Sequence, residues 1–280
     1  MLVRPVVKSI ERRMKFVVVL TALCAIANNS VVAQENPRLP RKFVEYSKCR
    51  TDISGCESDE SEWAVLDSVG NLLKSDLSVH AYVIGYSGRS ALFGSGIVHA
   101  NYARNLLRRW VAEDSRVRAV YGGRREHLTI EVWIVPDMSS LPRSTPTISL
   151  EQASANTAQK FYEYQHPYVD RISLELFSEH EYLNQPAILD GLAALLEKEF
   201  DRRAYIITYD GRRDRNGTAY KLAESDRFYL AMESNIASER ITLVNGGRRE
   251  NRTVELWVVP SGAAAPKPTP SMERKINRGR

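Results

Sequence analysis

The spacing of apolar residues changes along this chain, and the changes predict its secondary structure. Leucine and valine recur every three or four positions over 66–77, which is typical of a helix with one buried face. The segment 42–46 alternates between apolar and polar residues, as a half-buried strand does. The same reasoning predicts the order strand, helix, strand, helix, strand, strand, at 42–46, 66–77, 81–86, about 97–111, 117–121 and 129–136.

The whole pattern occurs twice. Leu66–Arg89 returns as Leu189–Arg212, and Tyr121–Pro136 returns as Asn245–Pro260 with ten of sixteen positions identical. A repeat of about 95–100 residues is long enough to be a domain rather than a solenoid unit. We therefore predict an α+β fold of two tandem β-α-β-α-β-β two-layer sandwiches, which we call copy 1 (42–136) and copy 2 (160–260).

The segments outside the copies differ from them in composition. Residues 137–159 are rich in Pro, Ser and Thr and predict a linker, and residues 261–280 predict a disordered basic tail. The formal net charge is +5, yet 1–33 and 261–280 each carry five Lys or Arg against one Glu, so the body between them comes to −3. A body with this charge does not favour a nucleic-acid partner.

The N-terminal segment 1–33 predicts a cleaved secretory signal. It combines basic residues, the apolar run 16–27 and small residues that end at Ala33. A membrane anchor is the alternative, but about 12 apolar residues are too few to span a bilayer. Residues 1–13 are either part of this signal or precede a true start at Met14. We expect an exported protein of the periplasm or cell exterior, with no transmembrane segment after cleavage.

Two cysteines remain after the predicted cleavage, and the expected export places them in an oxidising compartment. Cys49 and Cys56 lie close together in sequence, and an even pair in an oxidising compartment predicts a local disulfide. The alternative is a pair of free thiols. A metal site is not expected, because two thiolates without a nearby histidine form a poor zinc shell.

Alternation along the last strand of each copy predicts two different sheet faces. In copy 1, Ile130 and Val132 point to one side, whereas Glu131 and Trp133 point to the other. Copy 2 repeats this arrangement, and tyrosines alternate in the same way on the strand 81–86 and its counterpart. We hypothesise that each copy exposes an aromatic patch that packs against the other copy or a partner. The patch residues are Tyr82, Tyr86 and Trp133 in copy 1, and Tyr205, Tyr209 and Trp257 in copy 2.

The repeated sequence GGRRE precedes the last strand of each copy. Gly122-Gly123 and Gly246-Gly247 predict a tight hairpin turn with positive φ. The two arginines that follow are typical either of an anion-binding site or of surface ion pairs with the adjacent glutamate.

Several motifs resemble the OmpA-like, peptidoglycan-associated C-terminal domain, and the sequence also resembles a group of uncharacterised exported bacterial proteins. The motifs are AYIITYD (204–210), FYL (228–230), NIASERI (235–241) and NRTVEL (251–256). The resemblance implies a peptidoglycan peptide held by an Asp at a strand end and an Arg early in the second helix. Asp210 matches the Asp, and Ser87 replaces it in copy 1. Leu222 stands at the Arg position, which leaves Arg212 and Arg227 as the neighbouring candidates.

No motif in the sequence predicts catalysis. The histidines do not recur between the copies, and no metal set, P-loop or dinucleotide fingerprint is found. We expect no enzymatic activity, metal or cofactor. The predicted function is an exported cell-envelope protein that associates with peptidoglycan. The alternatives are a protein-interaction scaffold that uses the aromatic sheet faces for an envelope partner, and an unrecognised hydrolase.

Overall fold

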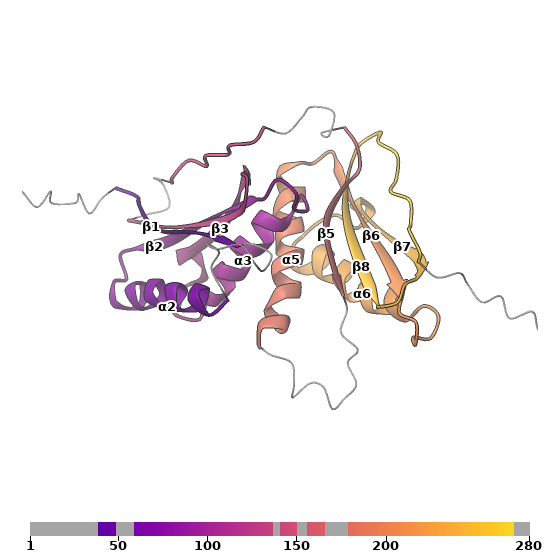
Figure 1. The fold of residues 1–280 in the computed structure, drawn as a ribbon, viewed down its shortest axis with the longest axis horizontal. Coiled ribbons are helices and arrows are strands. Elements are labelled where there is room, and N and C mark those ends of the chain that lie inside the picture. Colours follow the sequence, from indigo (N-terminus) through magenta and orange to yellow (C-terminus); the bar gives the residue numbers. More distant parts are fainter. Residues whose placement is uncertain (1–38, 49–58, 137–140, 150–155, 166–178, 272–280) are drawn as a thin grey trace, which may run out of the picture. The chain divides into compact units, whose positions relative to one another are not determined.

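A computed structural model describes residues 39–48, 59–136, 141–149, 156–165 and 179–271. The predicted signal segment 1–33 and both Cys49 and Cys56 lie outside the described residues. The described chain is a mixed α/β protein with two four-stranded sheets and four helices. Figure 1 shows α2 and α3 on one side of the first sheet.

Both copies have the predicted order of elements. Copy 1 consists of β1 (Arg41–Lys48), α2 (Asp59–Ser75), β2 (His80–Ser87), α3 (Ser95–Arg108), β3 (Val117–Arg124) and β4 (Leu128–Val135). Copy 2 consists of β5 (Gln159–Gln165), α5 (Glu179–Lys198), β6 (Arg202–Asp210), α6 (Thr218–Phe228), β7 (Ile241–Arg248) and β8 (Thr253–Pro260). A short π-helical turn, Tyr229–Glu233, follows α6.

The two sheets share one topology, in which the last strand lies in the interior. The strand order is β1-β4-β2-β3 in the first sheet and β5-β8-β6-β7 in the second. β2 and β3 are parallel, whereas β4 is antiparallel to both β1 and β2. Consecutive strands β3 and β4 are therefore not neighbours, and the connection between them passes the end of β2.

The prediction that the Gly-Gly pair forms a hairpin turn is wrong. Gly122 and Gly123 lie within β3, where the pairing with β2 shifts register so that Tyr86 faces Gly123. Gly122 is the extra residue of a β-bulge. A Cβ on Gly122 would lie 2.5 Å from the Tyr86 ring, so only glycine fits. The expected positive φ is present at Gly123, at 101°, and at Gly247, at 98°.

Helical spacing identified most of the core. Leu66, Val69 and Leu73 of α2 are buried against the sheet, together with the apolar face of β4. Leu77 and Phe200 were expected to extend this helix face, but they are 77% and 81% exposed. The physical reason is that α2 ends at Ser75 and α5 at Lys198, so both side chains lie beyond the helix.

An arginine closes the end of the first helix in each copy, and the one in copy 1 is buried. Arg116 is 5% exposed, and its guanidinium donates hydrogen bonds to the carbonyls of Leu73, Asp76 and Val79 at 2.7–3.2 Å. Arg240 does the same in copy 2. Carbonyls at a helix C-terminus have no partner within the helix, and a cation there also complements the helix dipole.

The described residues from Leu39 onward belong to one compact unit, and contacts join the two copies within it. The Gly94 amide donates to the Phe161 carbonyl at 2.8 Å, and the Phe161 ring packs in an edge-to-face arrangement against Phe93. Arg104 of α3 forms an ion pair with Asp190 of α5 at 2.5 Å. The copies are thus joined by packed helices and strands, in addition to the covalent chain.

The Arg116 contacts predict a large effect on stability. We expect Arg116→Met to lower the free energy of unfolding by roughly 2–4 kcal/mol, because three carbonyls lose a charged donor while the aliphatic length is kept. Urea denaturation measures the change. Arg118→Met, at an exposed position on the same strand, is the control and is expected to change stability by less than about 0.5 kcal/mol. Equal effects of the two substitutions would contradict the assigned role.

Candidate functional site

The sheet face that points away from the helices carries the same polar and aromatic cluster in both copies. We call it the sheet-face cluster. It lies on β1, β2 and β4, on the connection between β3 and β4, and on their counterparts in copy 2. The alternation predicted for the last strand places Glu131 and Trp133 on this face. The members in copy 1 are Lys42, Glu45, Tyr86, Arg125, Glu131 and Trp133, and those in copy 2 are Lys160, Glu163, Tyr209, Arg249, Glu255 and Trp257.

A buried carboxylate is the centre of the copy 1 cluster. Glu131 is 1% exposed, and four side chains donate hydrogen bonds to it. Lys42 Nζ and Arg125 Nη2 lie 2.8 and 2.7 Å from Oε1. Trp133 Nε1 and Tyr86 Oη lie 2.9 and 3.2 Å from Oε2. Each carboxylate oxygen therefore has two donors, which satisfies a group that would be costly to bury alone.

Copy 2 reproduces this geometry around Glu255. The four corresponding distances are 2.7 Å from Lys160, 2.6 Å from Arg249, 3.0 Å from Trp257 and 3.1 Å from Tyr209. Each differs from its copy 1 counterpart by only 0.1 Å. The two copies differ at many other positions, yet they share the chemistry and the geometry of this cluster.

A second carboxylate completes the charge balance. Glu45 lies directly opposite Glu131 in the β1–β4 pair, an arrangement in which like charges repel. Lys42 and Arg125 contact both carboxylates, with Lys42 Nζ 2.5 Å and Arg125 Nη1 3.1 Å from Glu45. Two cations and two anions thus form a closed network, and Glu163 occupies the equivalent place in copy 2.

The network keeps its central carboxylates ionised. Burial by itself would raise the pKa of Glu131, but hydrogen bonds from Lys42, Trp133 and Arg125 lower that pKa to about 2. The pKa of Glu255 is lowered for the same reasons. A carboxylate that stays ionised and accepts four hydrogen bonds is a poor proton shuttle near neutral pH. The cluster is suited to holding groups in place.

The cluster also buries the tyrosines that were predicted to be exposed. The Arg125 guanidinium lies 3.6 Å from the centroid of the Tyr86 ring, and Arg249 lies at the same distance from Tyr209. Both tyrosines are fully buried, Tyr82 is 7% exposed, and Tyr205, Trp133 and Trp257 are partly exposed. The expected exposed aromatic patch is therefore absent at Tyr86 and Tyr209, because a stacked arginine and an extended segment cover them.

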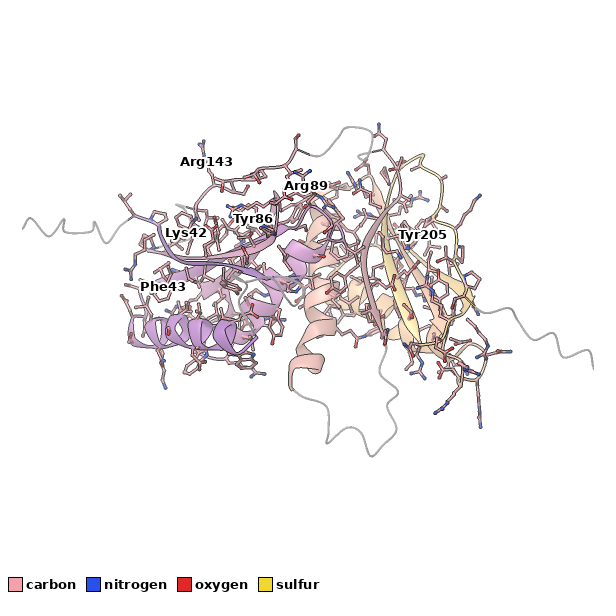
Figure 2. All side chains as sticks on the ribbon, viewed as in Figure 1. Lys42, Phe43, Tyr86, Arg89, Arg143 and Tyr205 are labelled. Atoms are coloured by element: carbon pink, nitrogen blue, oxygen red, sulfur yellow. The ribbon has the colours of Figure 1, made fainter. Side chains whose placement is uncertain are left out.

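That extended segment comes from the region predicted to be a linker. The backbone amide of Thr145 donates to Tyr86 Oη at 3.0 Å, and Arg125 Nη2 donates to Thr145 Oγ1 at 2.6 Å. In Figure 2, Lys42 and Tyr86 lie on the side of the copy 1 sheet that faces the segment carrying Arg143. Residues 141–148 thus follow the sheet face and contact the cluster, which a freely extended linker would not do.

The chain after copy 2 makes the same contacts. Thr269 donates its amide to Tyr209 Oη at 2.9 Å and accepts a hydrogen bond from Arg249 Nη2 at 2.7 Å. Residues 261–271 were expected to belong to a disordered tail, but the structure gives them this defined contact. The sequence holds a signal that was missed: Thr-Pro follows twelve residues after Trp133 and again twelve after Trp257. The duplication extends past the last strand.

The other residues of GGRRE position the neighbouring loops. Arg124 donates to the carbonyls of Gly88 and Ala91, and Arg248 acts likewise on Gly211. Glu126 pairs with Arg89 on the surface, as Glu250 pairs with Arg212. The first arginine therefore shapes the loop after the second strand, and the second belongs to the cluster. Only the glutamate forms the exposed ion pair that the sequence suggested.

The three candidate ligand residues of copy 2 do not converge. Asp210 accepts hydrogen bonds from the amides of Gly217 and Ala219 at 2.7 and 2.8 Å, and so caps the start of α6. Arg212 pairs with Glu250 at 3.4 Å on the surface. Arg227 is exposed in the last turn of α6, roughly 14 Å of helix beyond its start.

Ser87 explains why the Asp210 position differs between the copies. Its hydroxyl accepts a hydrogen bond from the Gly96 amide at 2.8 Å, nine residues further on, as Asp210 does from Ala219. Both side chains cap the second helix of their copy, and Ser and Asp are interchangeable in that role. The sequence change from Ser to Asp therefore keeps the fold and adds a carboxylate.

A second buried acid was not identified from the sequence. Asp226 of α6 accepts hydrogen bonds from Tyr164 and Gln185, and burial raises its pKa to about 6. In copy 1, Tyr46 instead donates to Glu62 of α2 at 2.8 Å. The copies thus place the acid that pairs with this tyrosine on different helices. Such an exchange cannot be recognised by comparing the aligned positions one at a time.

A cavity of about 220 Å³ lies elsewhere in copy 1. It is lined by Trp63, Leu66, Asp67, Leu106, Arg109 and Trp110, from α2 and the end of α3. Neither tryptophan recurs in copy 2, where Pro186 and Glu233 hold the matching sequence positions. The cavity is therefore not part of the arrangement that the copies share.

Comparison with known proteins gives no relative. No family model, curated protein or solved structure matches the chain. Among the described residues, no helix is both long enough and apolar enough to cross a membrane, and no group of three or more His, Cys, Asp or Glu is placed to hold a metal ion. The sheet-face cluster is thus defined by its own geometry and by its repetition.

The lowered pKa of Glu131 predicts how stability depends on pH. The folded state favours the ionised carboxylate, so this stabilisation is complete above the ordinary glutamate pKa of 4.5 and is lost as the pH falls towards 2. We expect Glu131→Gln to reduce the free energy of unfolding by about 3 kcal/mol at pH 7, and to reduce it less at pH 3. Urea denaturation at several pH values measures this.

Glu126→Gln is the matched control, because Glu126 forms an exposed ion pair in the connection between β3 and β4, just before the strand that carries Glu131. It is expected to change stability by less than about 0.5 kcal/mol at either pH. A Glu131→Gln effect that is equally large at pH 3 and pH 7 would show that the carboxylate charge is not what stabilises the fold.

Proposed function

We propose that this chain is an exported, non-enzymatic protein of the cell envelope that works as a protein-interaction scaffold. Its two tandem β-α-β-α-β-β sandwiches would each hold an extended polypeptide on the sheet face. The observation that carries the proposal is that the same cluster and the same contacts occur in both copies. In each, a tyrosine, Tyr86 or Tyr209, accepts a hydrogen bond from a backbone amide of an extended segment.

The energetics of the cluster support a role in binding. A buried ion network contributes little more stability than apolar side chains of similar volume, because the charges must first be desolvated. The network does hold Arg125 in one position, where it stacks on Tyr86 and presents donors to the segment. A preorganised donor set is what recognition of an extended chain requires, since it limits the entropy lost on binding.

The bound segments also have the chemistry of known peptide-recognition modes. Both are proline-containing and extended, and their backbone groups form the hydrogen bonds. Proline-rich segments lose little conformational entropy when they dock on aromatic surfaces. Trp133 and Trp257 belong to the two clusters and are partly exposed, and they supply aromatic surface on the sheet faces that the segments contact.

One observation favours a second candidate, association with peptidoglycan. A serine caps the helix in copy 1, whereas in copy 2 the capping residue is Asp210, which brings a negative charge to this position. That carboxylate stands where the OmpA-like resemblance implies the ligand group. Arg212 and Arg227, the accompanying candidates, lie apart from it, so the wall candidate depends on Asp210 alone.

The scaffold proposal predicts that Tyr209 holds the segment after copy 2. Tyr209→Phe removes the oxygen that accepts the Thr269 amide, and the loss of one such hydrogen bond costs about 1 kcal/mol. We expect amide exchange in 267–271 to become roughly fivefold faster, as measured by hydrogen–deuterium exchange. Tyr205→Phe, on the same strand and face, is the control and is expected to leave this exchange unchanged. Equal exchange in wild type and Tyr209→Phe would refute the proposal.

The wall candidate has its own test. If Asp210 binds the polymer, the mature chain co-sediments with purified sacculi and Asp210→Ser reduces the bound fraction at least tenfold, because serine keeps the helix cap and removes the charge. Asp201→Ser, at an exposed position, is the control. Thermal unfolding checks that Asp210→Ser remains folded. Absence of wild-type binding rejects the wall candidate, and unchanged binding by Asp210→Ser rejects this site.

A further inference from the structure

We propose that each sheet-face cluster recognises an extended Thr-Pro motif followed by Ser or Thr, and that the copy 2 cluster accepts this motif from a separate polypeptide in place of the chain's own Thr269-Pro270-Ser271. This inference rests on the proposed function and specifies its ligand. The motif is known to fit because the chain presents it twice, as Thr145-Pro146-Thr147 and as Thr269-Pro270-Ser271.

The threonine is recognised through three of its groups. In copy 2 its amide donates to Tyr209 Oη at 2.9 Å. Its hydroxyl accepts from Arg249 Nη2 at 2.7 Å, and its carbonyl accepts from Arg249 Nε at 3.3 Å. The corresponding copy 1 distances are 3.0, 2.6 and 3.2 Å. The hydroxyl contact distinguishes Thr from Val, which has the same shape without the acceptor.

The proline ring fits because the residue beside it in each copy is a glycine, which has no side chain to occupy the space. Gly123 and Gly247 have positive φ, and a Cβ at these glycines would lie 2.8 Å from Pro146 and 3.2 Å from Pro270. Proline has no amide that would need a partner here, and its fixed φ keeps the peptide extended. The residue after the proline donates its amide hydrogen to a carbonyl of the third strand. This bond joins Thr147 to Arg124 and Ser271 to Arg248, and it measures 3.0 Å in both copies.

The arginine that contacts the threonine is fixed before any ligand arrives. Arg249 stacks on Tyr209 at 3.6 Å and donates to Glu255 at 2.6 Å. Tyr209 in turn donates its own proton to Glu255, which leaves the oxygen lone pairs directed at the incoming amide. The buried carboxylate therefore orients both groups that recognise the motif. This role accounts for an ion network that is the same in both copies.

Copy 2 holds its own segment less firmly than copy 1 does. In copy 1 Leu141 joins the apolar cluster on the sheet face, and both Thr147 and Ile148 donate to the Arg124 carbonyl. The position that matches Leu141 in copy 2 is Ala265. Ala265 is a smaller side chain and is exposed, so it does not match the apolar contact of Leu141. Ser271 donates to the Arg248 carbonyl as Thr147 does to that of Arg124, and the residue that matches Ile148 lies outside the described residues. The copy 2 segment is therefore the one that a competing peptide displaces.

The experiment frees the copy 2 site in the full chain. The double variant Thr269→Gly with Pro270→Gly removes the hydroxyl and the ring while leaving copy 2 intact, and hydrogen–deuterium exchange of 261–271 verifies release. The probe is a labelled, end-blocked peptide with the sequence of residues 264–271, AAPKPTPS. Fluorescence anisotropy measures its binding. A tethered segment has an effective concentration of order millimolar, so the wild type competes strongly with the probe.

We expect the freed variant to bind the probe at least tenfold more tightly than wild type, at one peptide per chain. A probe with Thr→Val at the motif threonine, and the freed chain that also carries Tyr209→Phe, are each expected to lose at least fivefold in affinity. Tyr205→Phe in the freed chain is the matched control and keeps the affinity.

Each contrary result overturns a stated part. If the segment stays protected in the double variant, the motif contacts do not hold it, and the inference fails. If the freed chain does not bind the probe, or binds the Val probe equally well, recognition of Thr-Pro is refuted. Two peptides per chain would refute the assignment to copy 2. The scaffold proposal fails separately, when Tyr209→Phe leaves the exchange of the chain's own segment unchanged.

Discussion

One buried carboxylate in each copy determines how the sheet face is built. Glu131 and Glu255 each accept hydrogen bonds from a lysine, an arginine, a tyrosine and a tryptophan that come from four different strands or their connections. A buried charge is tolerated only when it is fully paired, so the four donors must be delivered together. The order of the strands, with the last strand in the interior, is what brings them to one point.

The bulge at Gly122 and Gly246 serves the same centre. It lets the third strand follow the second while leaving room for the tyrosine ring, and it turns the next residues so that Arg125 and Arg249 lie over that ring. Local backbone geometry, aromatic packing and charge therefore act on one another. The repeated GGRRE sequence and the strand after it were predicted to be a turn and a strand. In the folded chain they supply residues of the sheet-face cluster.

Periodicity predicted the order of elements and the two faces of the last strand, because burial imposes a period of two on strands and 3.6 on helices. It could not show that the last strand lies between the first and second, since strand order depends on long-range pairing. The burial of Tyr86 could not be foreseen either, because it depends on Arg125 and on residues 141–148. Composition alone made Thr145 and Thr269 look like parts of flexible segments, although their equal distances from Trp133 and Trp257 were visible in the sequence.

The contact at Thr145 also fixes the number of residues between the last strand of copy 1 and this threonine. Thr145 lies nine positions after Pro136, and Thr269 lies nine positions after Pro260. Inserting or deleting one residue within either interval would shift the threonine out of register with its arginine, although these are the places where composition suggests free variation. The spacing between strand and threonine is thus a constraint on the sequence divergence of this chain.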